Sequence, residues 1–144
     1  MHTVKDILSE KGKVIWSVSP ETKVFDALKL MAEKNIGAVL VIKDNSVKGI
    51  FSERDYARKV ILEGRSSHEI NVDEIMSPRV LYVTLDTAID ECMLLLTEKK
   101  IRHLPVYENE NLVGIISIGD VVKELLARKD LIIDQMERYI TNRI

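Results

Sequence analysis

Two short stretches of the chain carry a serine and an aspartate at the same spacing. "GIFSERD" covers Gly49–Asp55 and "GIISIGD" covers Gly114–Asp120, so Ser52 and Ser117 each stand three residues before an aspartate. This spacing forms a capping box when a helix begins after the serine. A carboxylate beside a helix N-terminus also suits the two adjacent hydroxyls of a ribose, and the free N–H groups suit a phosphate or sugar oxygen. The motif therefore permits a structural and a ligand-binding interpretation.

The two stretches belong to an internal repeat. Gly49 falls on Gly114, an offset of 65 residues, and at that offset residues 19–61 align with residues 84–126 without a gap. Further upstream, "VKDILS" resembles "VDEIMS" at an offset of 68 residues. A repeat of this kind is typical of two copies of one structural unit. We expect the first unit with its N-terminal segment at 1–65, the second at 66–128 and a C-terminal helix at 129–144.

Each copy predicts the same elements in the same order. Apolar runs at 14–18 and 80–83 predict strands, and "SPET" and "TLDT" have the chemistry of a helix N-cap. An apolar stripe with helical spacing follows, then two β-rich runs joined by a polar turn, then a second helical pattern. The predicted fold class is α/β (α+β), with two β-α-β-β-α units. Neither unit covers its sheet alone.

The segment after the second copy predicts a helix with one apolar face. Apolar residues stand at Ile132, Ile133, Met136 and Ile140. Such a face either closes the core or packs against another subunit. The sequence leaves both possibilities open.

The composition is that of a globular domain without a nucleic-acid partner. Hydrophobic residues make up 46% of the chain and charged residues 31%, and the net charge is −2. A protein that binds duplex phosphates needs a clustered basic surface, which this chain lacks. The single cysteine, Cys92, lies in an apolar helical pattern that predicts a buried, inert thiol. With no signal-peptide pattern and no apolar stretch of about 18 residues, we expect a cytoplasmic protein without a membrane partner.

The sequence motifs predict a protein that is not an enzyme. No motif activates a nucleophile, and neither a P-loop nor a dinucleotide-binding glycine turn is present. The three histidines, His2, His68 and His103, do not have the spacing of metal ligands. We therefore expect no enzyme, no metal and no catalytic cofactor.

The repeat, the order of elements and two long segments resemble a tandem pair of CBS domains, the Bateman module. The segments are "GAVLVIKDNSVKGIFSERDYARKV" and "RHLPVYENENLVGIISIGDVV", and the resemblance extends over about residues 4–127. The chain is similar to the small stand-alone CBS-pair proteins. The resemblance implies two units related by a pseudo-twofold axis, with two clefts between them that bind adenine nucleotides. AMP is the most common ligand in that family, and ATP, ADP, NAD(H) and S-adenosylmethionine also occur.

The resemblance also implies the residues of the two sites. Asp55 and Asp120 match the ribose-binding aspartate, and Ser52 and Ser117 match its serine or threonine. The neighbouring strand segments match the lining of the base or phosphate, and the linker positions match the walls of the cleft. The other candidate ligand-binding residues are Lys13, Trp16, Ile36, Gly37, Ala38, Arg54, Arg58, Arg79, Leu81, Arg102, His103, Leu104 and Gly119.

The two sites are not expected to be equal. Arg102 and His103 stand where the first copy has Gly37 and Ala38, and a cation on a strand that opens toward a cleft suits a phosphate. The alternative is a surface arginine beside a half-buried histidine. Gly119 precedes the second aspartate and would let a ligand approach the backbone closely.

We expect an adenine-nucleotide sensor that modulates an unidentified partner protein and forms a homodimer, as CBS pairs commonly do. The alternative from another class is a ligand-independent scaffold or oligomerisation module, in which the Ser–Asp motifs only cap helices. A weaker third possibility is an enzyme acting on nucleotides.

Overall fold

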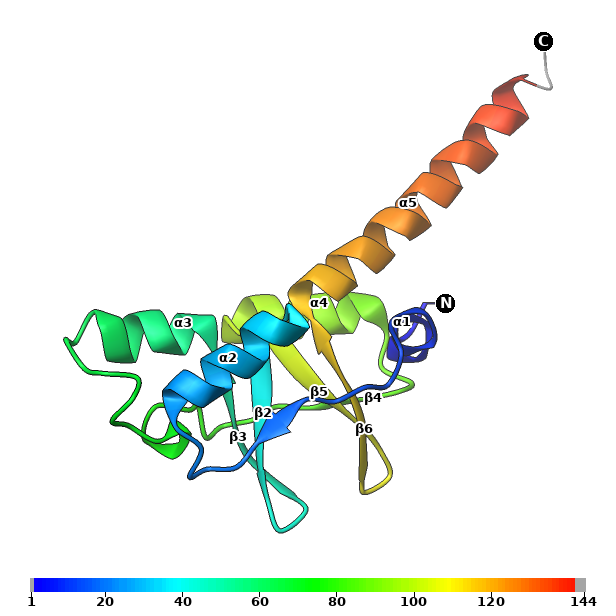
Figure 1. Cartoon of the computed structure of the whole chain (residues 1–144). Helices are drawn as coiled ribbons and strands as arrows, with labels where there is room; N and C mark the ends of the chain where they lie inside the picture. Colours follow the sequence, from blue (N-terminus) through cyan, green and yellow to red (C-terminus); the bar gives the residue numbers. More distant parts are fainter. Residues whose placement is uncertain (1, 142–144) are drawn as a thin grey trace. The chain divides into compact units, whose positions relative to one another are not determined.

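The computed structural model describes residues 2–141, excluding the side chains of 130–132 and 139–141. Each copy contains the predicted order β-α-β-β-α, and a helix that was not predicted, α1, precedes the first copy (Figure 1). The elements are α1 (Val4–Lys11), β1 (Ser17–Val18), α2 (Val24–Lys34), β2 (Ala38–Lys43), β3 (Ser46–Ser52), α3 (Glu53–Tyr56), the π-helical η1 (Ala57–Ile61), the 3₁₀ turn η2 (Val72–Glu74), β4 (Val83–Thr84), α4 (Ile89–Lys99), β5 (His103–Glu108), β6 (Asn111–Ser117) and α5 (Ile118–Thr141). The mixed α/β class is thereby confirmed. Within residues 2–141, no helix is both long and apolar enough to span a bilayer.

The two copies build two three-stranded sheets of one design. In each sheet the first strand pairs parallel with the second, and the second pairs antiparallel with the third. The antiparallel registers match at the repeat offset, since Ala38 pairs with Ser52 and His103 pairs with Ser117. Each second strand also carries an irregularity at the same place, after Val41 and after Val106. The repeat in the sequence is therefore a repeat of backbone pairing.

The chain folds into two compact units that do not follow the expected boundaries at residues 65 and 66. One unit, here called the Ser52 unit, consists of Val14–Leu81. The other, the Ser117 unit, combines the residues up to Lys13 with those from Tyr82 onward. The segment that precedes each sequence copy is thus part of the opposite compact unit.

Two corresponding segments make this exchange. In the Ser117 unit, Val4, Ile7 and Leu8 of α1 are buried in the core, and the Val4 amide donates to the Thr87 carbonyl at 3.0 Å. In the Ser52 unit, Val72 and Ile75 occupy the corresponding place. The repeated Val-x-x-Ile pattern therefore supplies the same apolar contact twice. The segment that precedes the first copy therefore covers the second copy, and the segment that precedes the second copy covers the first.

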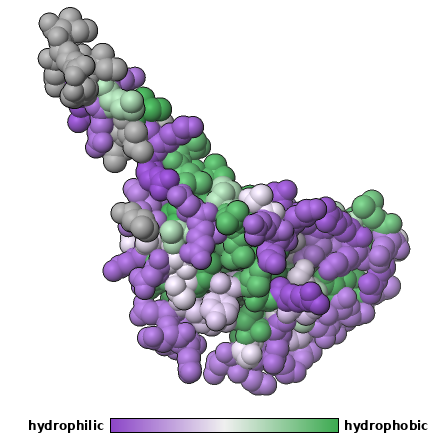
Figure 2. All heavy atoms as spheres, turned by 180° about the vertical axis from the view of Figure 1, so that it is seen from behind, coloured by the Kyte–Doolittle hydropathy of each residue, from purple (hydrophilic) through white to green (hydrophobic). Residues whose placement is uncertain are grey.

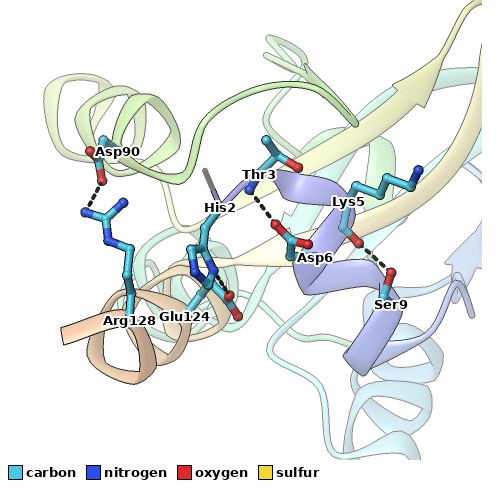
Figure 3. A network of polar contacts seen from close by, with 8 residues as sticks. All are labelled: His2, Thr3, Lys5, Asp6, Ser9, Asp90, Glu124 and Arg128. Carbon is cyan, nitrogen blue, oxygen red and sulfur yellow. Dashed lines mark hydrogen bonds and ion pairs between the residues drawn. The ribbon is translucent and has the colours of Figure 1, made fainter. Parts of the chain in front are cut away.

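Polar contacts fix both α1 and the start of α5 within the Ser117 unit (Figure 3). His2 Nδ1 lies 2.5 Å from Glu124 Oε1, and Arg128 Nη2 donates to Asp90 Oδ1 at 3.2 Å. The amide of Thr3, the N-cap of α1, donates to the side chain of Asp6. These contacts hold three helices of the unit against one another.

Three details differ from the sequence expectation. The first strand of each copy is only two residues long. The N-cap positions of α2 and α4 are held by Lys23 and Ala88, whose side chains make no capping hydrogen bond. In the "SPET" and "TLDT" segments, the Ser19 and Thr84 amides instead donate to threonine hydroxyls three residues on. These hydroxyls form a turn before the helix, so the helix starts later.

The C-terminal helix expected at 129–144 is the end of one continuous helix, α5, which begins at Ile118. No glycine or proline interrupts the sequence after Gly119, so the helical pattern of the second copy runs on without a stop signal. Of the predicted apolar face, Ile133 and Met136 are exposed, and the side chains of Ile132 and Ile140 lie outside the described residues.

Equivalent glycines of the two hairpins give a matched prediction. A Cβ at Gly49 would lie 2.7 Å from the Ser77 carbonyl oxygen, whereas one at Gly114 would lie 2.9 Å from the end of the Leu8 side chain. Since a side-chain end yields more easily than backbone, Gly49→Ala should lower the free energy of unfolding by about 1–3 kcal/mol. Gly114→Ala should lower the free energy of unfolding by a smaller amount. Urea unfolding of both variants measures the difference, and a larger loss for Gly114→Ala would contradict it.

Candidate functional site

The Ser52 unit places the first motif where β3 ends and α3 begins. The Asp55 amide donates to Ser52 Oγ at 3.2 Å, and the Ser52 amide donates to Asp55 Oδ2 at 2.9 Å. The Ser52 hydroxyl also donates a hydrogen bond to Asp55 Oδ2, at 3.1 Å. This reciprocal pair is a capping box, so the structural interpretation of the motif is realised. It holds the carboxylate rigidly at the strand end.

Strand pairing brings the expected strand segment to this motif. Ala38 is the register partner of Ser52, and the Glu53 amide donates to the Gly37 carbonyl at 3.1 Å. Ile36 and Gly37 are partly exposed beside the motif, whereas Ala38 is 6% exposed. Gly37 and Ala38 therefore lie beside the first motif, and a role of residues 36–38 in lining a ligand stays a prediction.

A lysine that sequence reasoning missed completes the first motif. Lys59 Nζ lies 3.4 Å from Asp55 Oδ1 and donates to the Ile75 carbonyl at 3.0 Å. The Asp55 side chain is only 13% exposed, so a nearby cation compensates the burial of its charge. The available signal was the spacing of four residues between acid and base, which places them on one helical face.

The Ser117 unit repeats the motif with the same geometry. The Ser117 amide donates to Asp120 Oδ2 at 2.8 Å, and the Asp120 amide donates to Ser117 Oγ at 3.1 Å. The adjacent strand again lies alongside, because His103 pairs with Ser117 and the Ile118 amide donates to the Arg102 carbonyl at 2.8 Å. The second capping box therefore starts α5.

Here the cation comes from the other end of the chain. Lys11 Nζ, at the end of α1, donates to Asp120 Oδ2 at 2.7 Å and to the Ile115 carbonyl at 2.9 Å. A polar hollow of about 150 Å³ opens beside this contact. It is lined by Ile7, Glu10, Lys11, Asp120, Lys123 and Glu124. Sequence reasoning missed Lys11 because the residue precedes the first copy, and only the exchange of segments brings it to the second motif.

Burial and neighbouring charges shift the pKa values of Asp120 and His103 at the second site. Burial raises the pKa of the Asp120 carboxyl, but hydrogen bonds from Lys11 and the Ser117 backbone outweigh it, and the pKa lies below its ordinary value of 3.8. Burial lowers the pKa of His103 to about 4, and Lys11 and Arg102 add to this effect against the attraction of Asp120. At neutral pH the site therefore holds an ionised aspartate and a neutral histidine.

The remaining candidate residues differ in how far they are exposed. Leu104 is fully buried in the core of the Ser117 unit, where its side chain supports β5. Trp16 is 38% exposed and lies under the ammonium of Lys34, which is 4.3 Å from the ring centroid. Arg54 is partly exposed. The exposed candidates are Lys13, Arg58, Arg79, Leu81, Arg102 and Gly119.

These motifs provide rigid hydrogen-bond acceptors beside cations. In the described part of the chain, no three His, Cys, Asp or Glu side chains gather in a group that could hold a metal ion. Cys92 is fully buried, as predicted, and burial raises the pKa of its thiol to about 11. The arrangement suits the recognition of hydroxyls and anions.

Lys11→Met should loosen the N-terminal helix from its unit. The substitution keeps a long apolar side chain but removes the donor to Asp120 and to the Ile115 carbonyl, which should cost about 1 kcal/mol. The measurement is urea unfolding, with Lys5→Met on the exposed face of α1 as the control. Equal stability of the two variants would contradict a structural role for the Lys11 contact.

Comparison with known proteins decides the family. The CBS domain matches twice, over residues 3–62 and 72–127. The chain belongs to the CBS-domain family. It is therefore a pair of CBS domains, and the resemblance noted in the sequence is confirmed.

Relatives and solved structures agree with this assignment. The CBS domain-containing protein CBSX3, mitochondrial, of Arabidopsis thaliana is 36% identical over 148 residues, covering 96% of this chain and 71% of the relative. The CBS domain-containing protein YhcV of Bacillus subtilis is 31% identical, with 84% of each chain covered. The solved structure of a protein with CBS domains from Burkholderia ambifaria has a TM-score of 0.85 at 50% identity, covering 88% of this chain and 95% of that chain.

Proposed function

We propose that this CBS pair binds an adenosine-containing ligand through its Ser–Asp motifs and thereby regulates another protein. The observation that carries the proposal is the lysine at each carboxylate. Lys59 and Lys11 come from unrelated places in the sequence, yet each brings an ammonium to the equivalent aspartate. Each ammonium compensates the burial of its carboxylate, and it can also attract a phosphorylated ligand.

The chemistry of the motifs favours a ribose and a phosphate, and membership of the CBS family makes an adenine nucleotide the candidate, with AMP first. Each aspartate is an acceptor for ribose hydroxyls, and each N-terminal helix turn adds N–H groups for a phosphate. The CBS pair of protein MJ0100 was solved in complex with 5′-methylthioadenosine and S-adenosylmethionine. At 21% identity and a TM-score of 0.77, that likeness concerns the fold and does not identify the ligand of the present chain.

The proposal does not include catalysis. The deeply buried thiol of Cys92 is protonated at neutral pH, and the aspartates are engaged by serine amides and by lysines. The aspartates are therefore placed to bind a ligand and not to react with it. A regulatory action then requires unequal affinity of the ligand for two states of the protein.

Thermal unfolding with AMP, ADP, ATP, NAD, NADH and S-adenosylmethionine tests this function. A ligand at about a hundred times its dissociation constant adds roughly 2.7 kcal/mol, which should raise the midpoint by about 5–10 °C. Asp55→Asn and Asp120→Asn keep the shape of the cap but remove the charge, and each should reduce the shift. Asp86→Asn, an exposed position in the Ser117 unit, is the control. A shift unchanged in both motif variants would contradict binding at these sites.

A ligand-independent scaffold is the second candidate function. The observation that favours it is that each Ser–Asp pair makes both reciprocal hydrogen bonds of a capping box. On this interpretation, none of the six compounds changes the unfolding midpoint, and the motif variants lose stability only.

A further inference from the structure

Equivalent residues on the edge strands of the two sheets are held in different ways. In the Ser52 unit, Ile50 of β3 exchanges two backbone hydrogen bonds with Ser77, at 3.0 and 2.9 Å. Ile115 of β6 is the equivalent residue of the Ser117 unit, and Lys11 Nζ donates to its carbonyl at 2.9 Å. Among residues 2–141, α1 makes no backbone hydrogen bond to β6, because Ser9, the counterpart of Ser77, lies inside the helix. A side chain thus replaces a backbone bridge.

The two ends of α1 differ in how they are attached to the Ser117 unit. At the first turn, the Val4 side chain is buried, and the Val4 amide donates to the Thr87 carbonyl at 3.0 Å. Leu8 is the last side chain of α1 in the core, and residues 9–11 are exposed. In the described part of the chain, Lys11 supplies the polar contacts of this last turn with β6 and α5. The last turn therefore depends on one side chain for its attachment.

Lys11 also occupies an acceptor that a ligand would use. Asp120 Oδ2 accepts the Ser117 amide at 2.8 Å and the Lys11 ammonium at 2.7 Å. A carboxylate oxygen has two lone pairs, so this oxygen has no further acceptor position. A ribose that donates to both oxygens of Asp120 must therefore displace one of these donors. The Ser117 amide is fixed in the backbone, whereas the Lys11 side chain is 36% exposed, so Lys11 is the donor that leaves.

The first motif does not have the same dependence. Its cation, Lys59, follows Asp55 by four residues in the chain and lies 3.4 Å from Asp55 Oδ1. Lys59 also donates to the Ile75 carbonyl, but the Ile75 side chain is buried and the Ser77 bridge fixes the same segment. Movement of Lys59 would therefore release no segment of the Ser52 unit.

We propose that ligand binding at Asp120 displaces Lys11 and releases the last turn of α1 from β6. This inference rests on the proposed function and describes the regulation of the second motif. The carboxylate itself stays in place, since Val121 is buried and Leu125 packs on the core at the start of α5. Figure 2 shows hydrophobic side chains among hydrophilic ones along this helix. The part that moves is therefore the end of α1.

The released turn leads directly into the chain that joins the two units. Gly12 follows Lys11 with a φ of 93°, and residues 12–16 have no regular structure before β1 begins. The boundary between the two units falls within this segment, after Lys13. Displacement of Lys11 thereby changes the start of the connection to the Ser52 unit.

Amide hydrogen exchange of the full chain, followed by NMR with and without saturating AMP, tests this release. AMP should move the Asp120 amide signal and accelerate exchange of the amides of residues 10–12 by more than about fivefold, because the last turn loses its attachment. Exchange at Val4 should stay unchanged. In Lys11→Met, the amides of residues 10–12 should exchange fast with AMP and without it. Lys5→Met, on the exposed face of α1, is the control and should respond as the wild type does.

The outcomes separate this inference from the proposed function. If AMP moved the Asp120 signal while exchange of residues 10–12 stayed the same or slowed, the release of α1 would be overturned and the ligand proposal would stand. If none of the six compounds moved the Asp120 signal, binding at the second motif would fail, and the release of α1 with it.

Adenosine tests the competition directly because it has the ribose without the phosphate. Lys11→Met frees an acceptor on Asp120, so adenosine, titrated at the Asp120 amide signal, should bind this variant about threefold to tenfold more tightly than the wild type. AMP should gain less, since its phosphate loses a nearby cation. Lys5→Met should leave both constants unchanged. Equal or weaker binding of adenosine to Lys11→Met would mean that Lys11 does not compete with the ribose, and would overturn the proposal.

Discussion

Acidification from pH 7 toward pH 4 should lower the free energy of unfolding by about 3 kcal/mol through His103 alone. Burial, together with the nearby Lys11, lowers the pKa of this imidazole from 6.5 to about 4. The unfolded chain therefore takes up a proton near pH 6.5, whereas the folded chain does so only near pH 4. Because the proton binds the unfolded state more tightly, stability falls as the pH falls through this window. Below about pH 4 the contribution is fully lost.

His103→Ala is the matched variant, since Ala38 stands at the equivalent position of the first copy. Urea unfolding at pH 7 and pH 4 measures how much unfolding free energy each protein loses on acidification. The variant should lose about 3 kcal/mol less than the wild type. Titration of Asp120 contributes little to the difference between pH 7 and pH 4. The pKa of Asp120 is lowered from 3.8, so its contribution is present above that value and is lost only at more acidic pH. Equal losses in the two proteins would contradict the burial of a neutral His103.

The sequence predicted what depends on neighbours along the chain. The shared offset of Gly49 and Gly114 implied two sheets with one register, and the structure has that register residue for residue at Ser52 and Ser117. The Ser–Asp spacing implied a capping box at the end of a strand, which both units contain. Local hydrogen bonds and the alternation of strand residues are sufficient for these features.

The exchanged segments depend on packing and were not predictable in the same way. "VKDILS" and "VDEIMS" look alike in the sequence, but nothing local says which sheet each one covers. Val4 packs with residues that follow Tyr82, and Val72 packs with residues that precede Leu81. The lysine of the second site follows from this exchange, because Lys11 reaches Asp120 only when α1 lies on the Ser117 unit.

The two phenylalanines of the chain allow the largest stability effect to be tested. Phe51 is fully buried in the Ser52 unit, and Phe51→Ala should lower the free energy of unfolding by about 3–5 kcal/mol because it leaves a cavity in the core. Phe25 is 41% exposed and stacks on His68 with ring centroids 4.1 Å apart. Phe25→Ala should cost only about 1 kcal/mol. Urea unfolding of both variants measures the two costs.

Hydrogen exchange links this prediction to the candidate site. Phe51 is the residue directly before Ser52, so the core contact of its ring fixes the strand end that accepts the Asp55 amide. In Phe51→Ala, exchange of the Asp55 amide should accelerate by more than tenfold, since that amide is protected only while the strand end stays in place. In Phe25→Ala the rate should change little. If both variants protected this amide equally, the motif would be held by its own capping box alone, and the core beneath β3 would have no part in positioning the carboxylate.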